Sequence, residues 1–350
     1  MIDLRSDFLS SPTPAMLAAM AAAAGMDKGY GPRGDPNQQR LEQRAAELLG
    51  KEDALFMPTC MMANLVAAMV AVKPGEAILL DQSSHMLRSE SGALAAHARA
   101  LALPIESVRG VIDPDRLAAM VDPGGMQQPR TAMLALENTH NKAGGVALPA
   151  SLLQAQREAV GSIWIHLDGS RLLNAAAALG ETASALARHA DSVSLSLNKG
   201  LSAPAGAILA GPSSFIERAT EVRQQLGGGW RPVGMLAAAA LVGLETMVPQ
   251  LAVDHRNAAR IARVLDACDG ISMDLESVQT NIVRGRLRHP RVTPGDLESA
   301  LLDAGIRLSV GEDGSFRVVT YHDITPAAAE KVCRVLREIL GARQAPTAPR

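Results

Sequence analysis

The chain of 350 residues is poor in aromatic residues and in cysteine. Aromatic side chains make up only 2% of it, so alanine and leucine must fill the core, which suits a fold rich in helices. The three cysteines, Cys60, Cys268 and Cys333, are odd in number, lie far apart and lack the short spacing of a metal site. Histidine and aspartate show no metal-ligand spacing either. We therefore expect a reducing compartment and no catalytic metal.

The chain also lacks segments that would direct it to a membrane or to nucleic acid. Its first residues carry no cationic and then apolar signal, and its most apolar runs, 14–26 and 235–244, are too short to span a bilayer. The net charge is −2, the isoelectric point is about 6.5, and no stripe of basic residues is present. These features predict a soluble, cytoplasmic protein whose partners are neither nucleic acids nor membranes.

Lysine is scarce as well, with six lysines against 28 arginines. Lys199 follows an alternating apolar run at 192–197 that predicts a buried strand, and it begins a turn rich in glycine, proline and serine. Asp168 ends another apolar run, and Arg171 follows three residues later. A lysine that forms a Schiff base and an acid beside a pyridine nitrogen are the groups that pyridoxal phosphate chemistry requires. The alternative interpretation is an ordinary surface lysine in a loop.

From residue 54 onward, apolar strand-like runs alternate with helix-like segments, among them a helix predicted over 85–98. This alternation predicts an α/β fold in which helices cover both faces of a mostly parallel sheet. The last two strands, 192–197 and 206–211, are so close in sequence that one of them should be antiparallel. We predict a large domain at 1–247 that includes an N-terminal arm, a smaller C-terminal α+β domain at 248–340, and a disordered tail at 341–350.

Several short motifs, taken in order, resemble those of the threonine aldolase and β-eliminating lyase family of fold-type I pyridoxal-phosphate enzymes. The resemblance extends from the first residues to about residue 340. Its motifs are IDLRSD (2–7), the Tyr30-Gly31 and Asp35-Pro36 loop, LENTHN (136–141), HLDGSRLLNAA (166–176), LNKGLSAPAG (197–206), GGGWR (227–231), TN (280–281) and RVVTYHD (317–323).

The resemblance implies a role in cofactor chemistry for four residues. Lys199 would form the Schiff base with the cofactor, and Asp168 would keep the pyridine nitrogen protonated. Arg171 would lie near the 3-oxygen of the ring and the substrate carboxylate. His85 would stack on the ring near the β-hydroxyl of the substrate, where a neutral histidine can accept its proton.

The resemblance also implies residues that hold the substrate and a site shared between subunits. Ser6 and Arg317 would bind the substrate carboxylate, and Arg317 would do so as a two-point fork. Arg231 would reach the cofactor phosphate of the neighbouring subunit, and Tyr30 would line the site near the dimer interface. The family consists of dimers, often paired into tetramers, so we expect a homo-oligomer with shared active sites.

The chain departs from the family pattern where the cofactor phosphate should bind, at residues 59–64. Cys60 and Met61 stand where the family usually has glycine and threonine. Backbone N–H groups at the start of a helix can still bind the phosphate, and Thr59 is the hydroxyl that could replace the missing one. Other departures near the site are Phe8, Ser170, Asn198, Gln224, Trp230 and Pro232.

The favoured function is an aldolase that cleaves a β-hydroxy-α-amino acid, such as threonine, allo-threonine or an aryl analogue, to glycine and an aldehyde. One alternative keeps the cofactor and breaks another bond, by β-elimination, transaldol exchange or decarboxylation. Another alternative is a homologue that binds little cofactor and acts as a scaffold. The sequence leaves His140 and His166 open to a purely structural role.

Overall fold

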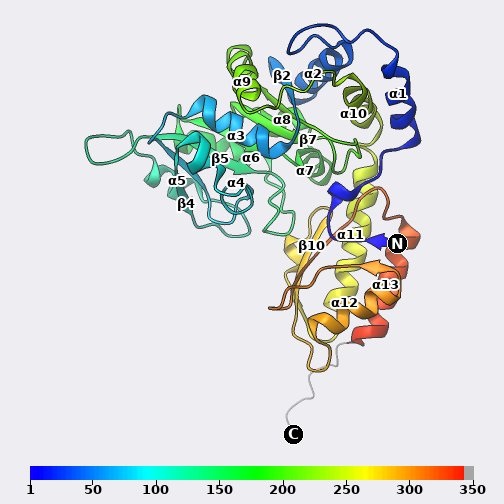
Figure 1. Ribbon diagram of the computed structural model, residues 1–350. Coiled ribbons are helices and arrows are strands. Elements are labelled where there is room, and N and C mark those ends of the chain that lie inside the picture. The colour runs from blue at the N-terminus through cyan, green and yellow to red at the C-terminus, as the bar shows by residue number, and fades with distance from the viewer. Residues whose placement is uncertain (343–350) are drawn as a thin grey trace.

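The computed structural model describes residues 1–342, and a seven-stranded sheet forms the centre of its larger part (Figure 1). The strand order is β2-β8-β7-β6-β5-β3-β4. Strand β8 pairs antiparallel with both of its neighbours, and the other strands share one direction, as predicted. The strands are β2 (Asp53–Met57), β3 (Ala77–Asp81), β4 (Leu101–Ile105), β5 (Thr131–Glu137), β6 (Trp164–Asp168), β7 (Ser192–Ser196) and β8 (Ala207–Gly211).

Helices cover both faces of this sheet, which is why β3, β5, β7 and β8 are buried at every position. One face packs against α3 (Cys60–Ala71), α9 (Ser213–Gln225) and the short π-helix η2 (Leu94–Ala98). The other face packs against five helices, namely α2 (Pro36–Leu49), α6 (Ala150–Val160), α7 (Leu172–Leu179), α8 (Ala183–Ala187) and α10 (Gly234–Thr246).

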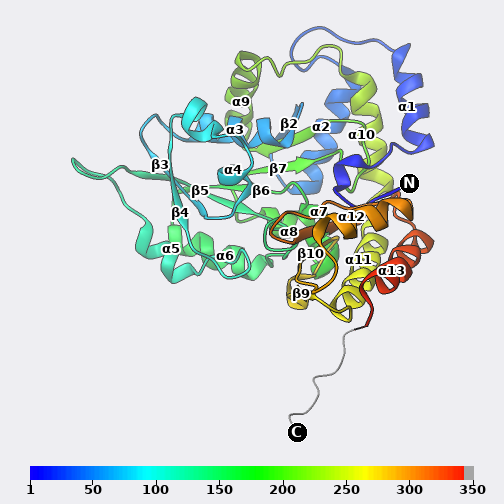
Figure 2. The same cartoon turned by 60° about the horizontal axis from the view of Figure 1, so that its bottom comes forward.

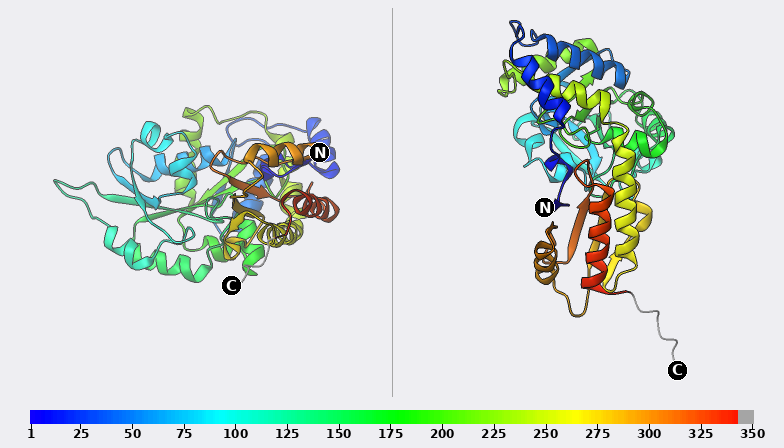
Figure 3. Two further views of the ribbon diagram at one scale, coloured as in Figure 1. Left: turned by 90° about the horizontal axis from the view of Figure 1, so that it is seen from below. Right: turned by 90° about the vertical axis from the view of Figure 1, so that its right-hand side faces the viewer.

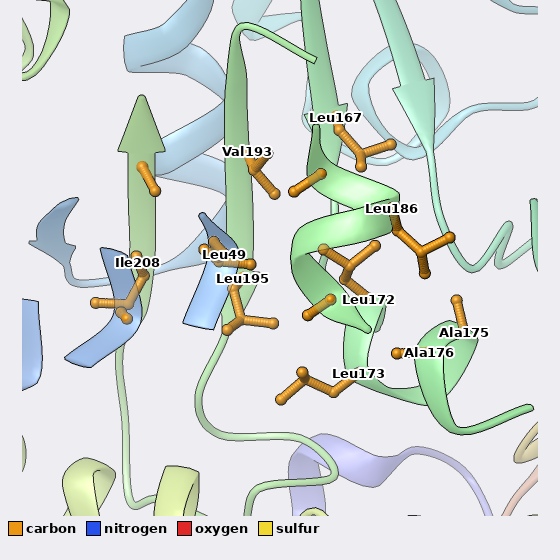
Figure 4. Packing of buried hydrophobic residues seen from close by; sticks show 14 of the residues in the cluster. Leu49, Leu167, Leu172, Leu173, Ala175, Ala176, Leu186, Val193, Leu195 and Ile208 are labelled. Atoms are coloured by element: carbon orange, nitrogen blue, oxygen red, sulfur yellow. The ribbon is translucent and has the colours of Figure 1, made fainter. Parts of the chain in front are cut away.

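Leucine and alanine fill the core, as the lack of aromatic residues predicts. Figure 4 shows Leu172 of α7 and Leu186 of α8 beside the strand residues Leu167, Val193 and Leu195. All five side chains are at most 1% exposed. The helices α1 (Pro14–Ala24) and α5 (Pro114–Met120) complete the larger part of the chain.

The helix predicted over 85–98 is wrong. Only a single turn, α4 (His85–Arg88), forms there, and η2 follows after a break. Ser91 and Gly92 have φ angles of 52° and 72°, in the left-handed region that a continuous right-handed helix excludes. The break leaves room for Glu90, whose buried side chain points back to His85.

A smaller unit follows the sheet and consists of a three-stranded antiparallel sheet with long helices (Figure 2). The N-terminal arm joins this unit, because β1 (Ile2–Asp3) pairs with β11 (Ile306–Arg307) (Figure 3). The other elements of the unit and of the arm are η1 (Asp7–Leu9), α11 (Gln250–Asp266), β9 (Ile271–Met273), η3 (Leu275–Ser277), β10 (Ile282–Leu287), α12 (Pro294–Asp303), β12 (Ser315–Val319) and α13 (Pro326–Leu340).

Helices α10 and α11 meet at an angle of 71° across residues 247–249. The boundary predicted between 247 and 248 lies at this bend and remains a prediction, and residues 343–350 of the predicted disordered tail lie outside the described residues. Within residues 1–342, no single helix is long and apolar enough to cross a membrane, although the bent pair α10–α11 meets the criteria of length and composition together.

Candidate active site

The predicted site residues gather where the parallel strands end. Glu137, the last residue of β5, pairs in register with Asp168, the last residue of β6. Asp168 pairs in turn with Ser194 of β7, five residues before Lys199. Because the carboxyl ends of parallel strands share one edge of the sheet, these side chains meet there, and this edge is the usual ligand site of such sheets.

Lys199 lies in the turn after β7 and is partly buried. Burial lowers the pKa of its amine, and the positive charge of Arg171 lowers that pKa further, against the opposing charges of Asp7 and Asp168. A lysine with a lowered pKa is neutral more of the time and is therefore a better nucleophile. This environment suits an amine that forms a Schiff base.

Asp168 is 2% exposed and is held in its ionised form. Its carboxylate accepts hydrogen bonds from Asn64 Nδ2 at 2.9 Å and from the Ser170 backbone N–H at 3.1 Å. Burial alone would raise the pKa of Asp168, but the charges of His85 and Lys199 and the hydrogen bond from Ser170 lower it overall. An ionised acid here can stabilise a protonated ring nitrogen.

His85 begins α4, and two carboxylates hold it. Its backbone N–H donates to Glu137 Oε2 at 2.7 Å, and its ring atom Nδ1 lies 2.8 Å from Glu90 Oε1. The hydrogen bond with Glu90 is the main reason that the pKa of His85 is raised. About 29% of the His85 side chain is exposed, so the ring remains accessible to a ligand.

Arg171 makes a two-point ion pair with Asp7 of the N-terminal arm. Its Nε and Nη2 atoms donate to the two carboxylate oxygens at 2.7 Å each. Asp7 is fully buried and also accepts from Asn281 Nδ2 at 3.1 Å. Asp7 was not among the predicted site residues, although its place as an acid inside the motif IDLRSD was a visible signal.

Ser6 and Arg317 lie together beside this ion pair. Ser6 Oγ is 3.5 Å from Asp7 Oδ1. Ser6 and Arg317 line a cavity of about 500 Å³ together with Arg5, Phe8, Leu9 and Ser309. Arg317 donates to Asn141 Oδ1 at 2.7 Å and to the Arg5 carbonyl at 3.0 Å. The guanidinium is thus oriented by neutral partners, which leaves its charge available to a carboxylate.

Tyr30 and Arg231 lie elsewhere on the chain. Tyr30 is fully exposed, and the two residues line a separate cavity of about 300 Å³ with Lys28, Asp35 and other residues. None of the residues around Lys199 lines that cavity. Their predicted roles depend on a second copy of the chain and remain predictions.

Comparison with known proteins identifies the family. A family model described as beta-eliminating lyase matches residues 3–287. The chain belongs to the beta-eliminating lyase family. It is 36% identical over 355 aligned residues to low-specificity L-threonine aldolase 1 of Arabidopsis thaliana, with 99% of this chain and 98% of that protein covered. It is 39% identical over 268 residues to the low specificity L-threonine aldolase of Escherichia coli K12, with 76% and 79% covered.

Solved structures agree with this family at the level of the fold. A Leishmania major threonine aldolase superposes with a TM-score of 0.83 at 19% identity, covering 97% of this chain and 99% of that one. A putative L-allo-threonine aldolase from Listeria monocytogenes gives 0.77 at 20% identity, covering 97% and 96%. The α/β architecture is therefore that of fold-type I pyridoxal-phosphate enzymes, as predicted.

The N-terminus of α3 carries the departures from the family pattern. Thr59 caps this helix, since its side-chain oxygen accepts from the Met62 N–H at 3.1 Å. Cys60 Sγ accepts from Ser170 Oγ at 3.0 Å, and burial raises the pKa of the Cys60 thiol to about 12, so it stays protonated. Met61 is exposed. The first backbone N–H groups of α3 still form an anion-binding end.

These residues fit pyridoxal phosphate, the cofactor of this family. The structure places an amine with a lowered pKa, an ionised acid and a capped helix N-terminus at one edge of the sheet. Lys199 would hold the cofactor covalently, Asp168 its ring nitrogen, and residues 59–61 its phosphate. His85, Glu90 and Asp168 also offer ligand atoms within 4.8 Å of one another. That no metal takes part in catalysis remains a prediction.

Asn64, which was predicted only as the end of the phosphate-binding stretch 59–64, connects residues of this site through hydrogen bonds. Asn64 is 1% exposed and makes four hydrogen bonds, with Glu90, Asp168, His166 and Ser194. Its signal was an uncharged polar residue inside the otherwise apolar helix CMMANLVAAMVA. A buried amide in such a helix requires partners, and here those partners are the site.

The two histidines left open by the sequence both have buried partners. His166 is fully buried between Ser192 Oγ at 2.9 Å and Asn64 Oδ1 at 3.0 Å, and burial lowers its pKa to about 4. It is therefore neutral at physiological pH. His140 is 1% exposed, with Nε2 3.1 Å from Asp81 Oδ1.

Proposed function

We propose that this chain is a pyridoxal-phosphate-dependent aldolase that cleaves a β-hydroxy-α-amino acid to glycine and an aldehyde. The observation that carries the proposal is the Lys199 amine beside the ionised Asp168, with the partly exposed ring of His85 at the same edge of the sheet. The relatives named as low-specificity L-threonine aldolases support threonine and its analogues as the substrate class.

In this proposal, each side chain acts on a defined atom. Arg317 binds the substrate carboxylate, and Ser6 adds a hydrogen bond. When bound, pyridoxal phosphate takes up the electron pair that is left on the substrate α-carbon. Asp168 favours this uptake by keeping the ring nitrogen protonated, and His85 accepts the proton of the β-hydroxyl. Arg171, fixed by Asp7, supplies positive charge beside Lys199.

The test is spectroscopic and kinetic. We expect the purified protein to absorb visible light through a cofactor bound covalently to Lys199, and to release aldehyde from a panel of β-hydroxy amino acids that includes aryl members. Lys199→Ala should abolish both the covalent linkage and turnover. Release of ammonia and a keto acid would instead support β-elimination, and a protein that takes up no added cofactor would contradict both readings.

We further propose a homo-oligomer, a dimer or a tetramer, in which Arg231 and Tyr30 complete the site of a neighbouring copy. Both residues are exposed in the single chain, which suits contact with a second subunit. The three free cysteines support a reducing, cytoplasmic location. We also propose that residues 1–247 and 248–340 are the large and small domains.

A further inference from the structure

A chain of hydrogen bonds runs through the protein interior from Trp164 toward His85. The indole Nε1 of Trp164 donates to Ser192 Oγ at 2.9 Å, and the same Oγ lies 2.9 Å from His166 Nδ1. His166 Nε2 lies 3.0 Å from Asn64 Oδ1. Ser192 and His166 are fully buried, and Asn64 is 1% exposed, so water does not compete for these contacts.

The groups at the two ends of these contacts have fixed roles. An indole N–H can only donate, so Ser192 Oγ accepts from Trp164. Asn64 Oδ1 can only accept, so the neutral ring of His166 carries its hydrogen on Nε2 and donates it there, while Nδ1 accepts from Ser192 Oγ. The amide group of Asn64 is thereby turned so that its Nδ2 faces away from His166.

The carboxylates on the other side of Asn64 fix this orientation. Asn64 Nδ2 lies 2.9 Å from Glu90 Oε1 and 2.9 Å from Asp168 Oδ2, and an ionised carboxylate can only accept. Asn64 Oδ1 also accepts from Ser194 Oγ at 2.8 Å. All four hydrogen-bonding positions of the Asn64 amide are therefore used, and the side chain has no alternative orientation.

The contact with Glu90 determines which ring nitrogen of His85 carries the hydrogen. Glu90 Oε1 is 2.8 Å from His85 Nδ1 and also accepts from Asn64. Burial and the charge of Asp168 raise the pKa of Glu90, while its hydrogen bonds with His85 and Asn64 favour the ionised form. An ionised Glu90 can only accept, so it accepts from both neighbours. Glu90 is 2% exposed and cannot turn toward water for another partner. The neutral ring of His85 therefore carries its hydrogen on Nδ1 and its lone pair on Nε2.

We propose that Glu90, held in place by Asn64, is the positioning residue that fixes His85 as a proton acceptor through Nε2. This inference deepens the proposed function and rests on it. The β-hydroxyl proton of the substrate passes to Nε2, and the O–H electron pair becomes the second bond of the aldehyde carbonyl. The Cα–Cβ electron pair stays on the α-carbon. The buried charge of Glu90 then balances the imidazolium that has formed.

The experiment uses the cofactor-loaded enzyme with ¹⁵N-labelled histidine, and the His85 signals are assigned with His85→Asn. At a pH above the raised pKa of His85, NMR of the wild-type enzyme should show the neutral ring with its hydrogen on Nδ1. Glu90→Gln keeps an oxygen acceptor of the same size but removes the charge. The pKa of His85 should then fall by about one unit, and kcat/KM should fall about tenfold or more. The acidic limb of the pH profile should move to lower pH.

Asp269→Asn is the matched control, because it removes a carboxylate 3.7 Å from another histidine, His289, in the smaller unit. It should leave the His85 signals unchanged. A wild-type spectrum with the hydrogen on Nε2, or an unchanged His85 pKa in Glu90→Gln, would overturn the inference. If Glu90→Gln does not fold, the wild-type spectrum decides alone. A wild-type enzyme that shows Nδ1–H but releases no aldehyde would refute the proposed aldolase and not the positioning of His85.

Discussion

Asp7 and Arg171 form an ion pair in a part of the protein that water hardly reaches, at 0% and 6% side-chain exposure. The attraction between buried charges does little more than offset the cost of removing both from water. Removing one partner is different, because the remaining charge stays buried without compensation. Asp7 therefore matters to stability as well as to the position of Arg171.

We predict that Asp7→Ala lowers the free energy of unfolding by about 3 kcal/mol, because it leaves Arg171 unpaired in the interior. Urea unfolding of the purified variant measures the loss. Asp3→Ala is the matched control in the same arm, since it breaks an ion pair with the exposed Arg5 and should cost at most about 1 kcal/mol. Equal losses in the two variants would contradict the prediction.

A second buried acid, Asp254, lies on α11. The side chain is fully buried, Oδ1 accepts from Gln250 at 2.9 Å, and Oδ2 has no hydrogen-bond partner. Burial raises the pKa of Asp254 to about 7, and the charges of Asp7 and Asp323 act in the same direction. The folded state thus keeps a proton that the unfolded chain releases near pH 4.

A raised folded-state pKa means that the stabilising contribution is complete at low pH and is lost as pH rises through about 7. Asp254→Asn cannot ionise and should not show this loss. Between pH 5 and pH 8, the free energy of unfolding of the wild type should fall relative to the variant by about 2 kcal/mol. Chemical unfolding at both pH values measures it, and parallel pH profiles would refute the expectation.

At the scale of elements, the N-terminus of α3 has two roles. Thr59 caps this helix of 12 residues, and the first backbone N–H groups of the helix are suited to bind the cofactor phosphate that we propose for this edge of the sheet. Thr59 Oγ uses a lone pair to accept from Met62, so its hydroxyl hydrogen remains available to a phosphate oxygen. Cys60 and Met61 supply no comparable hydroxyl.

We predict that Thr59→Ala weakens binding of pyridoxal phosphate about tenfold and lowers stability by about 1 kcal/mol through loss of the cap. Thr59→Ser keeps the hydroxyl and should retain most of both. Cofactor titration followed by absorbance gives the affinity, and thermal unfolding gives the stability. Unchanged cofactor affinity in Thr59→Ala would rule out the hydroxyl as a phosphate donor.

At the scale of the whole molecule, the loop of residues 25–35 and residues 231–233 line one cavity, and Tyr30 and Arg231 are exposed beside it. Arg33 fixes this loop to the body, since it donates to Asp53 and Glu42 at 2.8 Å each. A loop anchored at its base with Tyr30 fully exposed is suited to contact another subunit.

We predict that Lys199→Ala and Arg231→Ala, each inactive alone, restore activity when they are co-expressed and isolated as a mixed dimer. If the site is shared, one of its two sites has both native residues, so the mixed dimer should reach about half of wild-type activity. Different affinity tags isolate the mixed species. Activity no higher than that of either parent would show that Arg231 serves its own chain.

Much of this protein follows from local sequence. The alternation of apolar runs and helical segments predicts the parallel sheet, because both patterns arise from burial on each element by itself. The antiparallel β8 was predictable because few residues separate it from β7. Lys199 and Asp168 were visible as well, since each stands where an apolar strand ends. The helix expected over 85–98 was wrong, because a periodic pattern does not reveal that Ser91 and Gly92 adopt left-handed φ angles.

Only the tertiary structure decided which groups meet across long stretches of sequence. Asp7 lies 164 residues from Arg171, and Asn64 lies 104 residues from Asp168, so no local pattern could pair them. The pKa directions of Lys199, Asp168 and His85 arise from burial and from charges brought close by folding. The sequence by itself therefore determined the sheet and the residue types of the chemistry. Folding determined their protonation, since protonation depends on neighbours in space rather than neighbours in the chain.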